Sequence, residues 1–254
     1  MSGRKTFHDR RTLAEVNRLL RRIGAEAAVG ERMKTIARLL HGRPYRENPL
    51  VGSADSPEVF TFSLRAFDCV TYIETVLALA LARSARDFLR WLRRIRYRNG
   101  RVTWRDRHHY MVEWIRANAR QGVIADLTRG PMTVSRSKTL AVVAGRAPRR
   151  VRFRLFPKRM IGRIAPQMRD GDLLFFASTR KYLDVFHVGL VFVGADGITL
   201  SHAARSRGQV IEQPLEHFLR ENRMAGVLWV RPRRPENRAV RRARADGAPI
   251  GRRR

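Results

Sequence analysis

The sequence has a single cysteine among 254 residues, which excludes a fold held together by disulfide bonds. Long hydrophobic runs are also missing, because the longest, residues 76–82, is far below the ~20 residues that cross a bilayer. Charged residues throughout the N-terminal region leave no room for the apolar core of a signal peptide. We therefore expect no transmembrane segment and, by default, a cytoplasmic location, with the cell envelope as the alternative if translation starts further upstream.

Acidic residues and lysines are scarce as well. Asp and Glu number 22 against 53 Lys and Arg, which gives a net charge of +31 and a pI near 11.8. The lysines are only Lys5, Lys34, Lys138, Lys158 and Lys181. Such a charge attracts nucleic acid, anionic lipid or an anionic polymer such as cell wall. The arginines are scattered and lack interleaved aromatic residues, so a solvated arginine-rich surface explains the charge equally well, and any nucleic-acid binding would be non-specific.

Helical periodicity dominates the N-terminal half of the chain. Apolar residues at helical spacing predict two helices within residues 9–40, a third from Cys69 to about residue 81, a fourth around residues 88–95 and a fifth over residues 110–119. Asp68 is the expected N-cap of the third helix. A short strand is expected at residues 102–104.

The hydrophobic period changes to two after residue 170. Strands are predicted at residues 173–176, 185–193, 198–203 and 227–230, with a turn over residues 194–197. Helices followed by a compact antiparallel sheet indicate an α+β fold.

The lone Cys69 has two possible roles, packing and reactivity. It stands at the predicted start of a helix, where the backbone dipole makes a thiolate easiest to form. It also shares a helical face with Ile73, Val76 and Ala80, and free cysteine is among the most buried residue types. Cys69 alone does not decide between a nucleophile and a core residue.

Two histidines are placed by the strand pattern. Alternation puts the apolar residues at positions 186, 188, 190 and 192 on one face and His187 on the other, with Gly189 leaving room beside it. If Val193 pairs with Ile198 across the turn, His187 and His202 become diagonal neighbours on that second face. Two adjacent histidines suggest a general base and the group that orients it. The alternative is a pair of polar residues on a solvated face.

The order of these motifs resembles the NlpC/P60 superfamily of papain-like cysteine peptidases and amidases. Within it, the chain is similar to the DUF1460 family, described as N-acetylmuramoyl-L-alanine amidase-like. The matching segments are residues 64–69, 95–100, 107–110 with Trp114, 171–176, 183–190 and 201–203. The resemblance implies a papain-like α+β fold in which the nucleophile helix packs on a small antiparallel sheet. It implies a catalytic domain over residues 30–232, after an N-terminal helical extension (residues 1–29) and before a disordered arginine-rich tail (residues 233–254).

The resemblance also implies roles for individual residues. Cys69 matches the family nucleophile, His187 the general base and His202 the third, orienting residue. Tyr45 resembles the tyrosine near the oxyanion site, and the backbone N–H of Cys69, at a helix N-terminus, is a second expected oxyanion donor. The implied substrate is peptidoglycan or a muropeptide, cut at the N-acetylmuramoyl-L-alanine bond. Two alternatives stay open: a γ-D-glutamyl-diamino acid endopeptidase on the same centre, and a basic, non-catalytic protein that binds an anionic partner such as wall polymer or nucleic acid.

Further candidates for substrate binding are Arg65, Asp68, Arg107 and His109. Either arginine could hold a substrate carboxylate through two hydrogen bonds, or form an ordinary surface ion pair. His109 could line the cleft or be a satisfied core histidine, and Asp68 could be only a cap. Adjacent His108 and His109 lack a third ligand at metal-binding spacing, so neither a metal nor another cofactor is expected.

Overall fold

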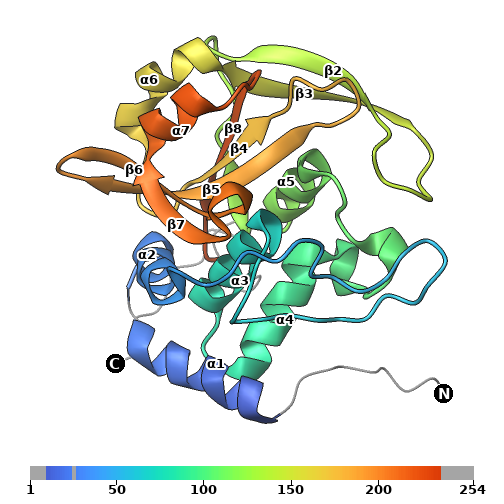
Figure 1. Ribbon diagram of the computed structural model, residues 1–254, viewed down its shortest axis with the longest axis vertical. Helices are drawn as coiled ribbons and strands as arrows, with labels where there is room; N and C mark the ends of the chain where they lie inside the picture. The colour runs from blue at the N-terminus through green and yellow to red at the C-terminus, as the bar shows by residue number, and fades with distance from the viewer. Residues whose placement is uncertain (1–9, 25–26, 236–254) are drawn as a thin grey trace, which may run out of the picture.

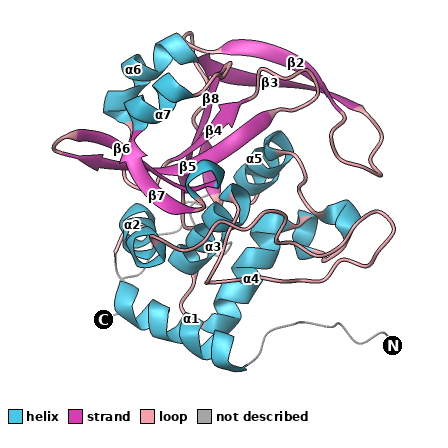
Figure 2. Ribbon diagram, in the orientation of Figure 1, coloured by secondary structure: helices cyan, strands magenta, loops and turns pink. Residues whose placement is uncertain are grey.

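A computed structural model describes residues 10–24 and 27–235, so the predicted tail lies outside the described residues beyond position 235. Figure 1 and Figure 2 show the helices of the N-terminal half gathered on one side of a sheet formed by the C-terminal half. The helices are α1 (Arg10–Ile23), α2 (Val29–Leu40), α3 (Cys69–Leu81), α4 (Ala85–Arg96), α5 (Met111–Arg120), α6 (Ile161–Ile164) and α7 (Leu215–Glu221). The architecture is the predicted α+β arrangement.

The sheet is antiparallel, in the order β2-β3-β8-β4-β5-β6-β7, with β1 paired to β8. The strands are β1 (Ile124–Asp126), β2 (Val134–Leu140), β3 (Arg149–Pro157), β4 (Leu173–Ala177), β5 (Val185–Gly194), β6 (Gly197–Ala204), β7 (Gln209–Pro214) and β8 (Gly226–Pro232). Apolar residues on the two faces form separate clusters, one shared with α3 and one shared with α6 and α7. The sheet is therefore buried on both faces over its central strands.

Helix α3 is the central helix of the molecule. From Thr71 to Leu81 every residue is buried, because the segment carries apolar residues on every side, with Glu74 as its one charged residue, and lies between the sheet and the neighbouring helices α2 and α4. Its contact with the sheet includes a hydrogen bond of 2.8 Å between Tyr72 Oη and Ser201 Oγ on β6. Helix α1 contributes Val16 to the same apolar cluster, so this helix packs on the rest of the described chain.

Most predicted elements are confirmed within a few residues, but two predictions are wrong or incomplete. Residues 102–104 do not form a strand, because Thr103 Oγ1 accepts a hydrogen bond from the Asp106 N–H and caps a 3-10 helix at Trp104–Asp106. Strands β1, β2, β3 and β7 were not predicted. In β3 the outward positions include Arg152 and Arg154, so charge obscures the alternation.

None of the helices formed by the described residues has the length and apolar character needed to span a membrane.

Candidate active site

Cys69 is the first residue of α3, and a reciprocal cap fixes its backbone. The Thr71 N–H donates to Asp68 Oδ1 at 2.7 Å, and the Asp68 N–H donates to Thr71 Oγ1 at 3.0 Å. These bonds satisfy amide groups that a helix start leaves without partners. The prediction that Asp68 is the N-cap is confirmed, and the cap holds the nucleophile candidate at a defined position.

The thiol of Cys69 lies against strand β5. The backbone of Val188, the residue that follows His187, lies near enough to act on the pKa of the thiol, and Cys69 as a whole is half-buried. Burial raises the pKa of the Cys69 thiol to about 12, and the Asp68 carboxylate adds to the rise, while backbone hydrogen bonds oppose it. The expected lowering at a helix N-terminus is therefore outweighed. A thiol in this environment needs a proton acceptor to become a nucleophile.

His187 and His202 are brought together as the hairpin pattern predicted. Val193 pairs with Ile198, and His187 Nε2 lies 2.7 Å from His202 Nδ1 with the two rings nearly perpendicular. The backbone ladder between β5 and β6 ends at Leu190 and Ser201, so the two rings meet just beyond its last pair. The side-chain hydrogen bond thus joins the strands where their main chains separate.

A β-bulge next to His187 sets the direction of Phe186. On β4, Phe176 pairs with His187 and Ala177 with Val185, which leaves Phe186 as an extra residue. Phe186 packs with Phe176, their ring centroids 6.4 Å apart, in the cluster shared with α7. The prediction that Phe186 shares a face with Val188 is therefore wrong, because simple alternation takes no account of a bulge.

A glycine beside the pair allows the strands to approach. A Cβ atom on Gly189 would lie 2.7 Å from Leu200 Cδ1, closer than real carbon contacts. A side chain here would have to displace the end of the Leu200 side chain, so glycine serves for space rather than for its backbone angles.

Aromatic rings enclose both histidines. Phe218 of α7 stacks on His187 at 5.4 Å between centroids and meets His202 edge-on at 5.3 Å. Burial lowers the pKa of His187 to about 3, with a further lowering from His202, and burial lowers the pKa of His202 to about 4. Both rings are therefore neutral near pH 7, and a neutral ring has one nitrogen that accepts a proton.

Tyr45 is held close to the start of α3. It forms a parallel bridge with Phe67, and its N–H donates to the Gly208 carbonyl at 2.7 Å. Burial, followed by the nearby Cys69 and then the Asp68 carboxylate, raises the pKa of the Tyr45 phenol. The phenol thus stays protonated and keeps a hydrogen to donate near Cys69.

Gln213 is a polar neighbour of the pair that sequence reasoning missed. It lies on β7, two residues along from Ile211, the residue that pairs with His202. Its Nε2 is 3.1 Å from His202 Nε2. Apolar and polar residues alternate only weakly in residues 209–214. Gln213 could therefore have been predicted only by pairing a third strand onto residues 199–204.

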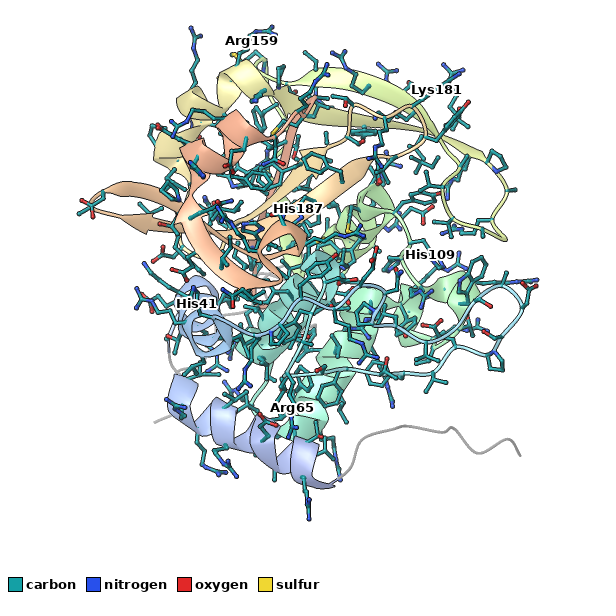
Figure 3. The ribbon with its side chains drawn as sticks, in the orientation of Figure 1. His41, Arg65, His109, Arg159, Lys181 and His187 are labelled. Carbon is teal, nitrogen blue, oxygen red and sulfur yellow. The ribbon has the colours of Figure 1, made fainter. Side chains whose placement is uncertain are left out.

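Three predicted binding residues lie elsewhere or are already engaged. Arg107 forms a largely buried ion pair with Glu58 at 3.0 Å. His109 Nε2 lies 2.7 Å from the Trp104 carbonyl oxygen. Figure 3 shows His109 and the exposed Arg65 apart from His187, which lies near the centre of the view. A substrate-binding role for these three residues stays a prediction. Among the described residues, no three His, Cys, Asp or Glu side chains gather where they could hold a metal ion.

Comparisons with known proteins agree on the family. The family model described as AmiA-like, N-acetylmuramoyl-L-alanine amidase-like, matches residues 35–227. A crystal structure of an N-acetylmuramoyl-L-alanine amidase from Bacteroides uniformis is 25% identical, with a TM-score of 0.71 over 81% of this chain and 99% of that one. Protein LPG0564 from Legionella pneumophila, assigned to DUF1460, is 17% identical, with a TM-score of 0.76 over 87% and 94% of the two chains, a likeness that concerns the fold. Curated protein sequences give no match. The chain belongs to the AmiA-like family of N-acetylmuramoyl-L-alanine amidase-like proteins.

Proposed function

We propose that this protein is a papain-like cysteine amidase that hydrolyses the N-acetylmuramoyl-L-alanine bond of peptidoglycan or muropeptides. The observation that carries the proposal is the bonded pair of His187 and His202, next to the strand backbone that contacts the Cys69 thiol. Family membership over residues 35–227 supports amide hydrolysis as the reaction. The net charge of +31 supports attraction to an anionic wall.

Acylation uses the groups at the start of α3. Sγ of Cys69 attacks the carbonyl carbon of the lactyl group, and the thiol proton passes to His187. The free ring nitrogen of His187 is Nδ1, because Nε2 is engaged with His202. The backbone N–H of Cys69 and the phenol of Tyr45 donate to the oxyanion. His187 then protonates the amino group of L-alanine, the C–N bond breaks, and a thioester remains on Cys69.

Deacylation reverses these roles. His187 takes a proton from water, the resulting hydroxide attacks the thioester carbonyl, and the C–S bond breaks to release muramic acid, whose carboxyl group then loses its proton to solvent. The proton returns from His187 to the Cys69 sulfur. The high pKa of the thiol makes this return favourable, since burial disfavours a free thiolate.

The decisive experiment is digestion of purified muropeptides, with the fragments weighed by mass spectrometry. The wild type should release a peptide that begins with L-alanine, and Cys69→Ala should lose turnover while its thermal unfolding stays close to wild type. His187→Ala should also lose turnover. His217→Ala is the matched control, because that histidine is exposed on α7, where it pairs with Glu221.

Other results would identify the alternatives. Fragments cut after D-glutamate would replace the amidase with a γ-D-glutamyl-diamino acid endopeptidase on the same centre. Intact muropeptides together with salt-sensitive binding of wall polymer or nucleic acid would indicate a binding protein and contradict the proposal.

A further inference from the structure

Three polar side chains form a continuous hydrogen-bonded chain across neighbouring strands. His187 comes from β5, His202 from β6 and Gln213 from β7. His187 Nε2 is 2.7 Å from His202 Nδ1, and His202 Nε2 is 3.1 Å from Gln213 Nε2. Among the described residues, His202 makes side-chain hydrogen bonds only with these two partners. Whether Gln213 presents a hydrogen-bond donor or an acceptor to His202 therefore determines whether His202 donates to His187 or accepts from it.

The orientation of the Gln213 amide, at one end of this hydrogen-bonded chain, determines the position of each proton. A neutral imidazole carries one proton, on either Nδ1 or Nε2, and accepts at the other nitrogen. With its Nε2 toward His202, Gln213 donates, so the proton of His202 lies on Nδ1 and is donated to His187 Nε2. The proton of His187 then lies on Nδ1, the nitrogen left for the nucleophile. In this arrangement His187 has no site that accepts the thiol proton.

A half-turn of the Gln213 amide reverses every bond in the chain. The carbonyl Oε1 accepts from His202 Nε2–H, His202 Nδ1 accepts from His187 Nε2–H, and Nδ1 of His187 becomes free to take a proton. The same arrangement also suits the doubly protonated His187 that forms after attack, since its Nε2–H keeps an acceptor. The reversed chain is the only one of the two that serves a general base.

We propose that Gln213 is a positioning residue that selects the tautomer of His202, and through it the base-competent form of His187. This inference rests on the proposed function, in which His187 is the base. Gln213 is only partly buried, which leaves its amide space to turn, whereas His202 is 3% exposed and Phe218 packs against both rings. Solvent is largely excluded from His202, whereas His187 is only half-buried, so the Gln213 amide controls the tautomer of His202.

Two substitutions in the full-length protein separate positioning from mere packing. Gln213→Glu presents only acceptor oxygens when ionised and fixes the base-competent tautomer. Gln213→Met keeps the length of the side chain and removes both its donor and its acceptor. Gln167→Met is the matched control, because Gln167 is exposed and belongs to a different part of the chain.

The first measurement is the nitrogen-15 chemical shifts of the His202 and His187 rings, which report the protonated nitrogen without any need for turnover. Gln213→Glu should hold His202 in the Nε2–H form, and Gln213→Met should shift its tautomer relative to wild type. The second measurement is muropeptide hydrolysis. Gln213→Met should lower kcat about 10- to 100-fold with little change in KM, a part of the 10²–10⁴-fold that general acid–base catalysis contributes. Gln213→Glu should keep most of the wild-type kcat.

The outcomes distinguish this inference from the proposed function. Identical ring shifts in all three proteins would overturn it, as would a kcat for Gln213→Met equal to those of wild type and Gln167→Met. If the wild type does not hydrolyse muropeptides, the proposed function fails, while the ring shifts still decide whether Gln213 sets the tautomers.

Discussion

Removing the positive charge of Arg96 should destabilise the helix that carries Cys69. Arg96 of α4 and Glu74 of α3 form an ion pair of 2.7 Å with side chains 1% and 2% exposed. Glu74 also accepts a hydrogen bond of 3.1 Å from Trp114 Nε1, and Arg96 donates to the Thr61 carbonyl at 2.6 Å. In Arg96→Met the Glu74 carboxylate keeps only its bond from Trp114, in a site from which water is excluded.

The magnitude follows from the cost of an unpaired buried charge. Removing one partner of a buried pair costs about 3–5 kcal/mol, a large share of the stability of a single domain. Burial already raises the pKa of Glu74, and Arg96 opposes that rise, so Arg96→Met should raise this pKa further. A folded-state carboxyl pKa above the unfolded value lowers stability above the unfolded pKa of about 4.5. The free energy of unfolding that Arg96→Met loses relative to wild type should therefore be larger at pH 7 than at pH 5.

Urea unfolding followed by far-ultraviolet circular dichroism measures this free energy. The double variant Glu74→Gln/Arg96→Met should recover at least half of the loss, because a neutral amide oxygen still accepts from Trp114. Arg90→Met is the control, since its pair with Asp87 is exposed and worth less than about 1 kcal/mol. A loss below about 1 kcal/mol in Arg96→Met, or a double variant no more stable than the single one, would refute the reasoning.

Three further predictions concern the active site. Alkylation of Cys69 by iodoacetamide at pH 7 should be much slower in His187→Gln than in wild type and should recover only at high pH, because burial raises the pKa of the thiol to about 12; equal rates would exclude His187 as the base. The pKa of His187 falls to about 3 on folding from about 6.5, so its contribution to stability is complete above pH 6.5 and is lost as the pH falls toward 3. When the pH is lowered from 8 to 5, the free energy of unfolding in urea should therefore fall by ~2 kcal/mol more for wild type than for His187→Gln. Asp68→Asn should keep the cap but lower the pKa of the Cys69 thiol, since the carboxylate contributes to its rise; a pH profile of alkylation that does not move would count against that electrostatic effect.

The elements predicted well are those whose signal is local. Helix α3 begins at Cys69 as expected, since Asp68 and Thr71 satisfy each other across a single turn. The β5–β6 hairpin has the predicted register because Gly194 and Gly197 close a tight turn between alternating strands. Such interactions span only a few residues, so they can be read without knowing the rest of the fold.

The missed strands depend on partners far away in the sequence. Strand β3 joins the sheet through β8, about 70 residues later, by the pair Phe156–Val227. Strand β7 has a single fully buried residue, Val210, so its hydrophobic pattern is weak. Strand formation of this kind follows from pairing and packing in the folded protein rather than from intrinsic preference.

Local sequence signals were enough to predict the α+β order, the capped helix that starts at Cys69, and the pairing of His187 with His202, because caps, turns and alternation act over short distances. Three features depend on the folded protein as a whole: the bulge that turns Phe186, the burial that keeps the Cys69 thiol and both histidines neutral, and the approach of Gln213 to His202. The physical reason is that desolvation and long-range hydrogen bonds depend on what the whole fold packs around a group. The single cysteine is a nucleophile candidate because its helix packs on the strands that carry the two histidines.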